Sequence, residues 1–392
     1  MPHPLIARSP DLVRLQNEGF DIEIRAGHLV VHDVPYVNDR KEVGVGTLVS
    51  DLTLNGDITA RPQNHIAMFA GDQPCDLAGR PITAIIHAAQ RLDLGQGVVI
   101  DRSFSNKPAS GYTDYFHKIT TYVAILSGPA EALDIGVTAR TFKVRDGEDD
   151  SPFLYVDTAS SRAGIGQITR KLALDRAVIV GLGGTGAYTL DLLAKTPVRR
   201  IDLFDGDRFL QHNAFRGPGA PSIALLRTKP WKVDYWQSVY SPMHGGIVAN
   251  RAYLHDENVD QLAGADIVFL CMDAGPAKAA IIRGLERLGL SFIDVGMGLD
   301  LVDDQILGQV RVTSSTPAKR DHVWAGRVSM TGGDEEDLYG RNIQVADLNM
   351  LNASLAVGRW KRMLGFYLDL EHEHHSVYAV DGNHLLNEER AT

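Results

Sequence analysis

The sequence predicts an α/β protein: a doubly wound, mostly parallel sheet in the C-terminal part, preceded by a separate α+β or β-rich domain. Three observations support this fold class. A strand, a glycine-rich turn, a helix and a second strand follow one another over residues 176–216. Another apolar strand is expected at Ile267–Met272, and residues 1–145 have a different, turn-rich texture. We therefore expect two domains, 1–150 and 151–392.

The glycine-rich turn follows a buried strand. Ala177–Val180 is apolar and rich in β-branched residues, which is typical of a parallel strand covered on both faces. The glycines of the turn, in the pattern G-x-G-G-x-G, are Gly181, Gly183, Gly184 and Gly186. Residues without a Cβ let the backbone approach a phosphate, and the N–H groups that begin the next helix favour an anion. The pattern predicts nucleotide binding; a turn that serves only helix–sheet packing is the alternative.

An acidic residue ends the next strand. Tyr188–Ala194 is apolar at helical spacing, and a strand is expected at Arg200–Phe204. Asp205 follows directly, where the ribose of a nucleotide would lie. The polar residues that come later are Asp207, Asn213, Arg216, Lys229 and, after Ile267–Met272, Asp273. They suit a polyphosphate and a metal, whereas a nicotinamide would need an apolar pocket and a hydride partner.

This set of residues resembles the ThiF/MoeB family of adenylyltransferases, the family of the ubiquitin-activating enzymes. Its members carry G-x-G-G-x-G, then D-x-D, N-x-x-R, a lysine and a later aspartate. The matching positions are Gly181–Gly186, Asp205–Asp207, Asn213–Arg216, Lys229 and Asp273. The resemblance covers roughly residues 160–390 and implies a Rossmann-like, ThiF/MoeB-like sheet. Ala274 departs from the family, which usually has asparagine there.

The resemblance implies attack of a carboxylate on the α-phosphorus of ATP, which yields an acyl-adenylate and pyrophosphate. It assigns the glycine backbone and Arg216 to the phosphates and Asp205 to the ribose. Lys229 would stabilise the charge that develops on the phosphates, and Asn213 would orient a phosphate or the attacking carboxylate.

The resemblance also implies a magnesium ion and a further arginine. Asp273 would bind Mg²⁺, with Asp207 as a candidate second ligand. The alternative for Asp273 is a helix cap for residues 276–288. In relatives an arginine before the glycine turn reaches ATP, sometimes across a dimer; Arg162 and Arg170 are both candidates, and a surface arginine is the alternative.

The carboxylate substrate implied by the family is the C-terminal glycine of a ubiquitin-like, β-grasp protein, in a bacterial ubiquitin-like conjugation or sulfur-transfer pathway. A conjugating enzyme is a candidate second partner, and a homodimer is the family's expected assembly. Three alternatives stay open: a small-molecule carboxylate, an NAD-dependent oxidoreductase, and a non-catalytic nucleotide-binding scaffold.

The N-terminal region shows no catalytic motif. A helix is expected at Pro10–Gly19 and a strand at Thr121–Leu126. The other expected strands are Phe20–Arg25, His28–Val31, Val45–Leu52 and Ile82–Ala88. The acidic, turn-rich run at 146–152 is expected to be a linker. We expect this region to dock a partner.

Two cysteines and one histidine-rich tract complete the candidate groups. Cys271 lies in an apolar strand and is expected to be buried and inert. In relatives the segment that corresponds to residues 314–340 can carry a thioester cysteine, but here it contains none. Cys75, in a polar, turn-like stretch, is therefore the candidate, and it is expected to be the more exposed of the two cysteines. Without a thioester, the adenylate passes directly to a partner. Glu371–His375 resembles a metal tract, but a solvated loop is expected.

Composition excludes several classes of function. The formal charge of −10 argues against nucleic acid and anionic membranes as main partners. Two cysteines are too few for a disulfide framework or a four-cysteine zinc site. No apolar run has membrane-spanning length, and the N-terminus lacks the core of a signal peptide, so a cytoplasmic protein is expected.

Overall fold

The computed structural model describes residues 4–143, 151–154, 157, 159–160, 165–330 and 343–390. The chain folds as two compact units. The first comprises residues 1–150 and 155–170, and the second comprises residues 151–154 and 171–392. The run expected as a linker, 146–152, lies mostly outside the described residues. The domain bounds 1–150 and 151–392 stay a prediction.

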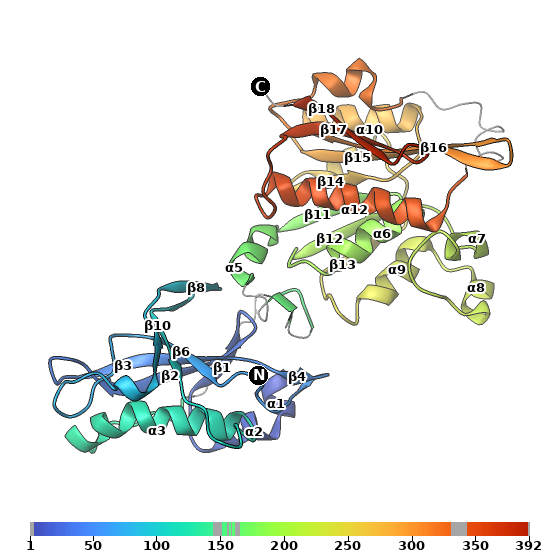
Figure 1. The fold of residues 1–392 in the computed structure, drawn as a ribbon. Helices are drawn as coiled ribbons and strands as arrows, with labels where there is room; N and C mark the ends of the chain where they lie inside the picture. The colour runs from blue at the N-terminus through green and yellow to red at the C-terminus, as the bar shows by residue number, and fades with distance from the viewer. Residues whose placement is uncertain are drawn as a thin grey trace. The chain divides into compact units, whose positions relative to one another are not determined.

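The N-terminal unit is built on a six-stranded antiparallel sheet (Figure 1). In spatial order its strands are β1 (Ile22–Arg25), β2 (His28–Val37), β3 (Val43–Asp51), β6 (Ile66–Ala70), β10 (Arg102–Ser105) and β7 (Ile86–Ala88). Two small hairpins are formed by β4 (Leu54–Asn55) with β5 (Ile58–Thr59), and by β8 (Leu92–Gly95) with β9 (Val98–Ile100). Its helices are α1 (Pro4–Arg8), α2 (Pro10–Asn17), α3 (Tyr115–Leu133) and α5 (Gly166–Thr169), with 3-10 turns at Thr83–Ile85 and Arg170–Leu172, the latter running into the second unit. The expected β-rich N-terminal domain is confirmed.

Helix α3 replaces the strand expected at Thr121–Leu126, so that expectation is wrong. The Asp114 carboxylate accepts a hydrogen bond from the backbone N–H of His117 and caps the start of the helix. Ile119, Tyr122 and Leu126 recur at helical spacing and are fully buried against the sheet. The alternation that resembled a strand is outweighed by this longer apolar face, because burial against the sheet decides the conformation.

The second unit contains an eight-stranded sheet of mostly parallel strands. In spatial order these are β13 (Ile247–Asn250), β12 (Arg200–Phe204), β11 (Arg176–Val180), β14 (Ile267–Leu270), β15 (Phe292–Val302), β16 (Gln305–Ser315), β17 (Glu373–Ala379) and β18 (His384–Arg390). The first five are mutually parallel, and the last three add on antiparallel to their neighbours. The predicted doubly wound, mostly parallel sheet is therefore confirmed.

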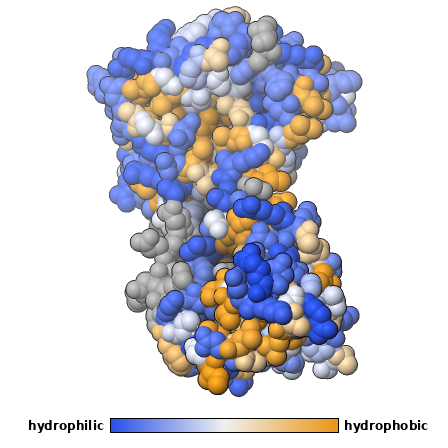
Figure 2. Space-filling view, turned by 90° about the vertical axis from the view of Figure 1, so that its left-hand side faces the viewer, coloured by the Kyte–Doolittle hydropathy of each residue, from blue (hydrophilic) through white to orange (hydrophobic). Residues whose placement is uncertain are grey.

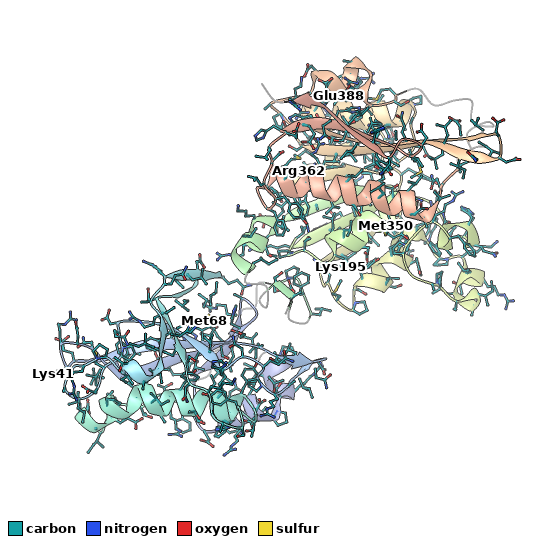
Figure 3. All side chains as sticks on the ribbon, viewed as in Figure 1. Lys41, Met68, Lys195, Met350, Arg362 and Glu388 are labelled. Carbon is teal, nitrogen blue, oxygen red and sulfur yellow. The ribbon has the colours of Figure 1, made fainter. Side chains whose placement is uncertain are left out.

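Helices cover both faces of this sheet (Figures 1 and 3). They are α6 (Gly184–Leu193), α7 (Gln211–Ala214), α8 (Ile223–Thr228), α9 (Lys232–Tyr240), α10 (Pro276–Arg287) and α12 (Ala346–Met363), with a 3-10 turn at Val259–Leu262 and a π turn at Val323–Arg327. Strand β11 shows why both faces are needed. Ala177 and Ile179 pack in the core that contains α6 and α12, whereas Val178 and Val180 pack in the core that contains α10.

The order of the strands locates the site. The chain runs outward from β11 to β12 and β13, then returns to the other side of β11 to form β14 and β15. The direction of winding therefore reverses between β11 and β14, and ligands of open α/β sheets bind at the carboxyl ends of such strands. The glycine turn follows β11 and Asp273 follows β14, so both lie at this edge.

A membrane span requires a helix of sufficient length and hydropathy. Among the helices of the described ranges, none combines the length and hydropathy needed to span a membrane. The face of the molecule drawn in Figure 2 is largely hydrophilic, with smaller apolar patches in both units.

Replacing Leu126 with alanine tests the helical packing of α3. Leu126 is fully buried, so we expect the N-terminal unit to lose about 2–5 kcal/mol of unfolding free energy. Urea unfolding of the full chain, followed by circular dichroism, measures this change. Leu133→Ala is the matched control, because Leu133 lies in the same helix but is 46% exposed. Equal effects of the two substitutions would contradict the packing described here.

Candidate nucleotide site

The glycine turn is shaped by close backbone contacts. Gly181 has a positive φ of 88°, and a Cβ there would lie 2.7 Å from the carbonyl oxygen of Cys271. A Cβ on Gly186 would lie 1.9 Å from the carbonyl oxygen of Gly181, so this helix packs too closely on the strand for any side chain. Gly183 is different, because a Cβ there would meet no atom within 4 Å. Packing therefore explains two of the glycines, whereas Gly183 leaves open space at the start of α6.

The first turn of α6 faces that open space. Gly183 is the N-cap of α6, and no side chain caps the N–H groups of the first helical turn. These N–H groups and the positive end of the helix dipole suit an anion. The arrangement is what the sequence predicts for a phosphate-binding turn.

Asp205 ties the glycine turn to the second strand. One oxygen of its buried carboxylate accepts a hydrogen bond from the N–H of Leu182 at 2.7 Å, and the other accepts from the N–H of Asp207 at 2.8 Å. The turn and the residues after β12 are thus held by one charged group. Each oxygen keeps a second lone pair that could accept from a ribose hydroxyl.

A lysine that the sequence analysis passed over lies beside this carboxylate. Lys232, the first residue of α9, is buried; its Nζ lies 2.7 Å from one oxygen of Asp207 and 3.6 Å from one oxygen of Asp205. Tyr253 donates a hydrogen bond to the other oxygen of Asp207. Burial alone would raise the pKa of Asp207, but the hydrogen bonds from Lys232 and Tyr253 outweigh it, and the pKa lies below its usual value.

Lys229 lies outside this cluster. It ends α8 in a left-handed conformation and its side chain is exposed. Its backbone carbonyl accepts a hydrogen bond from Arg208, and within the described residues its ammonium group makes no hydrogen bond or ion pair. Both lysines belong to the segment Lys-Pro-Trp-Lys. Their environments differ because α9 begins at Lys232, whereas Lys229 lies before it.

Arg216 follows α7, and its backbone is hydrogen-bonded to that helix. Its backbone N–H donates to the carbonyl of Asn213, and Asn213 in turn accepts a side-chain hydrogen bond from the N–H of Leu210 at 2.8 Å. Across the described part of the chain the guanidinium of Arg216 has no hydrogen bond or ion pair. Burial is the main cause that lowers the pKa of His212 in α7, and the charges of Arg216 and Lys232 lower it further.

Asp273 follows β14 at the same edge of the sheet. The backbone of Cys271 and Met272 contacts Gly181, so this aspartate comes one residue after a segment that touches the glycine turn. Asp273 is exposed. Within the described residues, no group of three or more histidine, cysteine, aspartate or glutamate side chains is placed to hold a metal ion.

Of the two cysteines, Cys75 differs from its expected environment, whereas the thiol of Cys271 is buried as expected. Cys75 was expected to be the more exposed; this is wrong, because its side chain is fully buried and its thiol donates to the carbonyl of Gln73. Burial raises the pKa of Cys75, which disfavours the thiolate. Cys271 is in a partly exposed residue, and burial of its sulfur raises the pKa to about 12.

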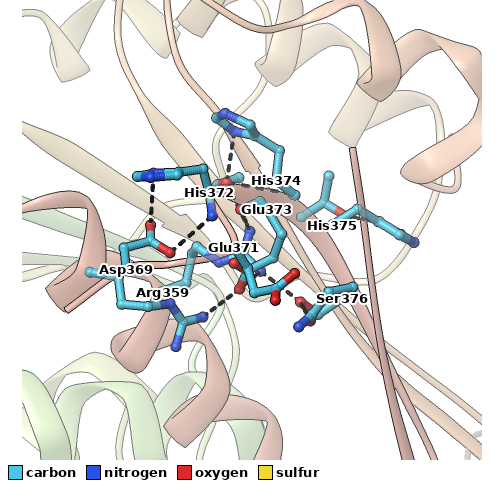
Figure 4. A network of polar contacts seen from close by, with 12 residues as sticks. Arg359, Asp369, Glu371, His372, Glu373, His374, His375 and Ser376 are labelled. Carbon is cyan, nitrogen blue, oxygen red and sulfur yellow. Dashed lines mark hydrogen bonds and ion pairs between the residues drawn. The ribbon is translucent and has the colours of Figure 1, made fainter. Parts of the chain in front are cut away.

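The expected solvated loop at Glu371–His375 is wrong for Glu373–His375, which enter the sheet, whereas Glu371 and His372 are exposed (Figure 4). Strand β17 begins at Glu373, whose buried carboxylate lies 2.7 Å from the guanidinium groups of both Arg359 and Arg362. His375 is buried, and its Nδ1 is hydrogen-bonded to Thr313 at 2.9 Å. Burial and neighbouring arginines lower the pKa of His375 to about 4. The tract joins β17 to α12 by charge-assisted hydrogen bonds.

Of the two candidate arginines before the glycine turn, one lies among the described residues. Arg162 lies outside the described residues. Arg170 belongs to the N-terminal unit, where its guanidinium lies 3.6 Å from the carboxylate of Asp93. Which arginine reaches the nucleotide stays a prediction.

Replacing Lys232 with methionine tests the electrostatics of the cluster. We expect a loss of about 1–3 kcal/mol at neutral pH, because the buried carboxylate of Asp205 and the paired carboxylate of Asp207 lose their cation. A lowered pKa contributes stability above the usual carboxyl pKa of about 4 and loses it as the pH falls through the folded-state value. The difference between the two proteins should therefore shrink towards acid pH.

Urea unfolding over a series of pH values measures this difference. Lys229→Met is the control and should change stability by less than about 0.5 kcal/mol, because this side chain is exposed. A loss in Lys232→Met that is independent of pH would contradict the ion pair.

Comparison with known proteins separates the chain into two families. Residues 10–158 match a family described as a domain of unknown function, DUF6791. Residues 160–319 match the ThiF family, and this range contains the glycine turn, Asp205, Lys232 and Asp273. The chain has no significant match among curated proteins.

Solved structures with a similar arrangement include two named proteins. A crystal structure of E. coli MccB with ATP is 16% identical, covers 59% of this chain and 72% of its own, and has a TM-score of 0.45. E. coli MccB with succinimide is 14% identical over 60% of this chain and 73% of its own, with a TM-score of 0.43. PaaA is 15% identical over 69% of this chain and 85% of its own, with a TM-score of 0.46. Residues 160–319 of this chain are a ThiF family domain, preceded by a domain of a family whose function is unknown.

Proposed function

We propose that the protein is an adenylyltransferase that uses ATP and Mg²⁺ to activate a carboxylate, the C-terminal glycine of a ubiquitin-like β-grasp protein. The observation that carries the proposal is that, within a ThiF family domain, the open glycine turn is hydrogen-bonded to Asp205, which lies beside Lys232, and also contacts the backbone of Arg216. A turn used only for packing would not account for the open space at Gly183, nor for the guanidinium of Arg216, which has no hydrogen bond or ion pair among the described residues.

The nucleotide would lie along the carboxyl ends of β11 and β12. The N–H groups at the start of α6 bind its phosphates together with Arg216, and Asp205 accepts from the ribose. Lys232, rather than Lys229, is the lysine we propose to stabilise charge on the phosphates, because it already lies beside Asp205 and Asp207. To reach a phosphate, its ammonium exchanges a carboxylate partner for a phosphate oxygen.

The residues present fit a magnesium ion if water and the substrate phosphates supply its other ligands. Mg²⁺ is usually held by one or two carboxylates together with water and substrate phosphates, so an exposed Asp273 suffices on the protein side. Asp207 fits less well as a second ligand, because Lys232 and Tyr253 already occupy its two oxygens. When bound, the ion neutralises phosphate charge and orients the triphosphate.

The reaction needs little covalent help from the protein. A carboxylate oxygen of the substrate forms a bond to the α-phosphorus, and the bond from that phosphorus to the bridging oxygen breaks, so the products are the acyl-adenylate and pyrophosphate. No proton is transferred. The contribution of the chain is to orient the two anions and neutralise their charge, with Arg216 and Lys232 as cations and Asn213 aligning the carboxylate.

The partners follow from the same proposal. We propose that the adenylate passes directly to a conjugating enzyme or sulfur carrier, since the thiol of Cys75 is buried. The N-terminal unit would dock that partner, and two copies of the chain would form a homodimer in the cytoplasm, as in the family that the sequence resembles.

Replacing Asp273 with alanine tests the proposed metal ligand. We expect ATP-dependent pyrophosphate release to fall by about 10²–10³-fold, the range observed when a single group that stabilises transition-state charge is removed. Asp300→Ala is the control, because Asp300 is an exposed carboxylate in β15. Full activity in folded Asp273→Ala would remove Asp273 from the mechanism.

A comparison of the two lysines tests the second assignment. Lys232→Ala should lower pyrophosphate release by at least about 10²-fold, whereas Lys229→Ala should retain activity within a few-fold. Pyrophosphate release measured at saturating ATP decides between them. The reverse order of effects would return the role to Lys229.

A further inference from the structure

We infer that Asn349 is a positioning residue for the nucleotide site, because it holds the backbone of Arg216 against the glycine turn. This inference rests on the proposed function and adds a residue from α12, an element that contributes none of the groups assigned above. It predicts that Asn349 acts on the nucleotide through Arg216.

The side chain of Asn349 joins three segments. Asn349 is only 1% exposed and lies in the first turn of α12. Its Oδ1 accepts a hydrogen bond from the hydroxyl of Thr185 at 2.9 Å, and its Nδ2 donates to the carbonyl of Arg216 at 3.3 Å. Thr185 belongs to the first turn of α6 and Arg216 follows α7. One amide therefore connects α12, the phosphate-facing helix and the arginine.

Close packing makes this connection tight. A Cβ on Gly184 would lie 2.1 Å from Nδ2 of Asn349 and 2.8 Å from the carbonyl oxygen of Arg216. Neither atom leaves room for a side chain at Gly184, so this glycine is required by the amide and by the arginine backbone. A shift of Asn349 would therefore displace the start of α6 or the segment at Arg216.

The backbone anchors of Arg216 make it sensitive to such a shift. Among the described residues its N–H donates to Asn213, its carbonyl accepts from Asn349, and its guanidinium has no partner. No hydrogen bond, ion pair or ring contact among the described residues fixes the guanidinium, so its place depends on where its backbone is held. A displacement of about 1 Å can cost about 10²-fold in rate at a site that works by positioning.

The same helix supplies a matched comparison. Asn352 is also 1% exposed and lies one turn further along α12, where its Nδ2 donates to the carbonyl of Gly296 in β15 at 3.0 Å. It fastens the same helix to the sheet without touching Arg216. Both asparagines lie on the buried side of α12, whereas Met350 between them, labelled in Figure 3, is half exposed. A structural loss alone should appear at both asparagines.

A double-mutant cycle on ATP binding tests the inference. The proteins are full-length wild type, Asn349→Leu, Arg216→Gln and the double variant, with Asn352→Leu made alone and with Arg216→Gln. The Kd for ATP, measured by calorimetry, needs no carboxylate substrate. We expect Asn349→Leu to weaken binding about tenfold in the wild-type background and less than about twofold beside Arg216→Gln, because coupled residues are not additive. Asn352→Leu should have the same effect in both backgrounds.

Two outcomes would overturn the inference: no change in Asn349→Leu, or equal losses with and without Arg216→Gln. If Asn349→Leu does not fold, Asn349→Asp replaces it, since this variant keeps the acceptor for Thr185 and loses the donor to Arg216. Pyrophosphate exchange is measured on the same proteins. Wild type that binds ATP without exchange on any carboxylate would overturn the proposed function, while the binding cycle would still decide the role of Asn349.

Discussion

The structure of the site depends on the carboxylate of Asp205. This one group accepts hydrogen bonds from the turn after β11 and from the residues after β12, and it lies beside the ammonium of Lys232. Two strand ends and the start of α9 are therefore fixed relative to one another by a buried charge. Buried carboxylates are costly unless they are paired and hydrogen-bonded, and this one satisfies both conditions. The open space at Gly183 lies next to this arrangement.

A second buried ionic group holds the antiparallel part of the sheet to α12. Glu373 lies between Arg359 and Arg362, and burial lowers the pKa of Arg359 to about 10. These contacts hold α12 to β17 near the C-terminal end of the helix, as Figure 4 shows. Near its N-terminal end, Asn349 holds α12 to the glycine turn. The helix thus connects the antiparallel extension of the sheet with the nucleotide site.

Local patterns predicted the parallel strands well but did not single out Lys232. The strands at Ala177–Val180 and Arg200–Phe204 are confirmed, because strands covered on both faces must be apolar along their length. Lys229 and Lys232 are three residues apart, and only the start of α9 determines which of them meets Asp205. Thr121–Leu126 alternates like a strand, but these residues are part of a helical apolar pattern that extends along Tyr115–Leu133.

Buried polar residues were the hardest to predict. Cys75 lies in a polar stretch, yet it is fully buried and forms an isolated bridge with Val37 of β2. The tract at Glu371–His375 looks solvated, yet its residues from Glu373 onward belong to β17, which pairs with two neighbouring strands. Asn349 gave no signal, because an asparagine among apolar helical positions has no meaning until its partners are known. Sequence spacing describes contacts along one element, whereas these residues depend on contacts between elements.

The most direct test of adenylation is ATP–pyrophosphate exchange by the wild-type protein, with a β-grasp protein that ends in glycine as the substrate. The same β-grasp protein with an amidated C-terminus is the control, because it cannot supply the attacking carboxylate. The account predicts exchange that requires both Mg²⁺ and the free carboxylate. Exchange that is absent despite ATP binding, or that is unchanged by amidation, would contradict it.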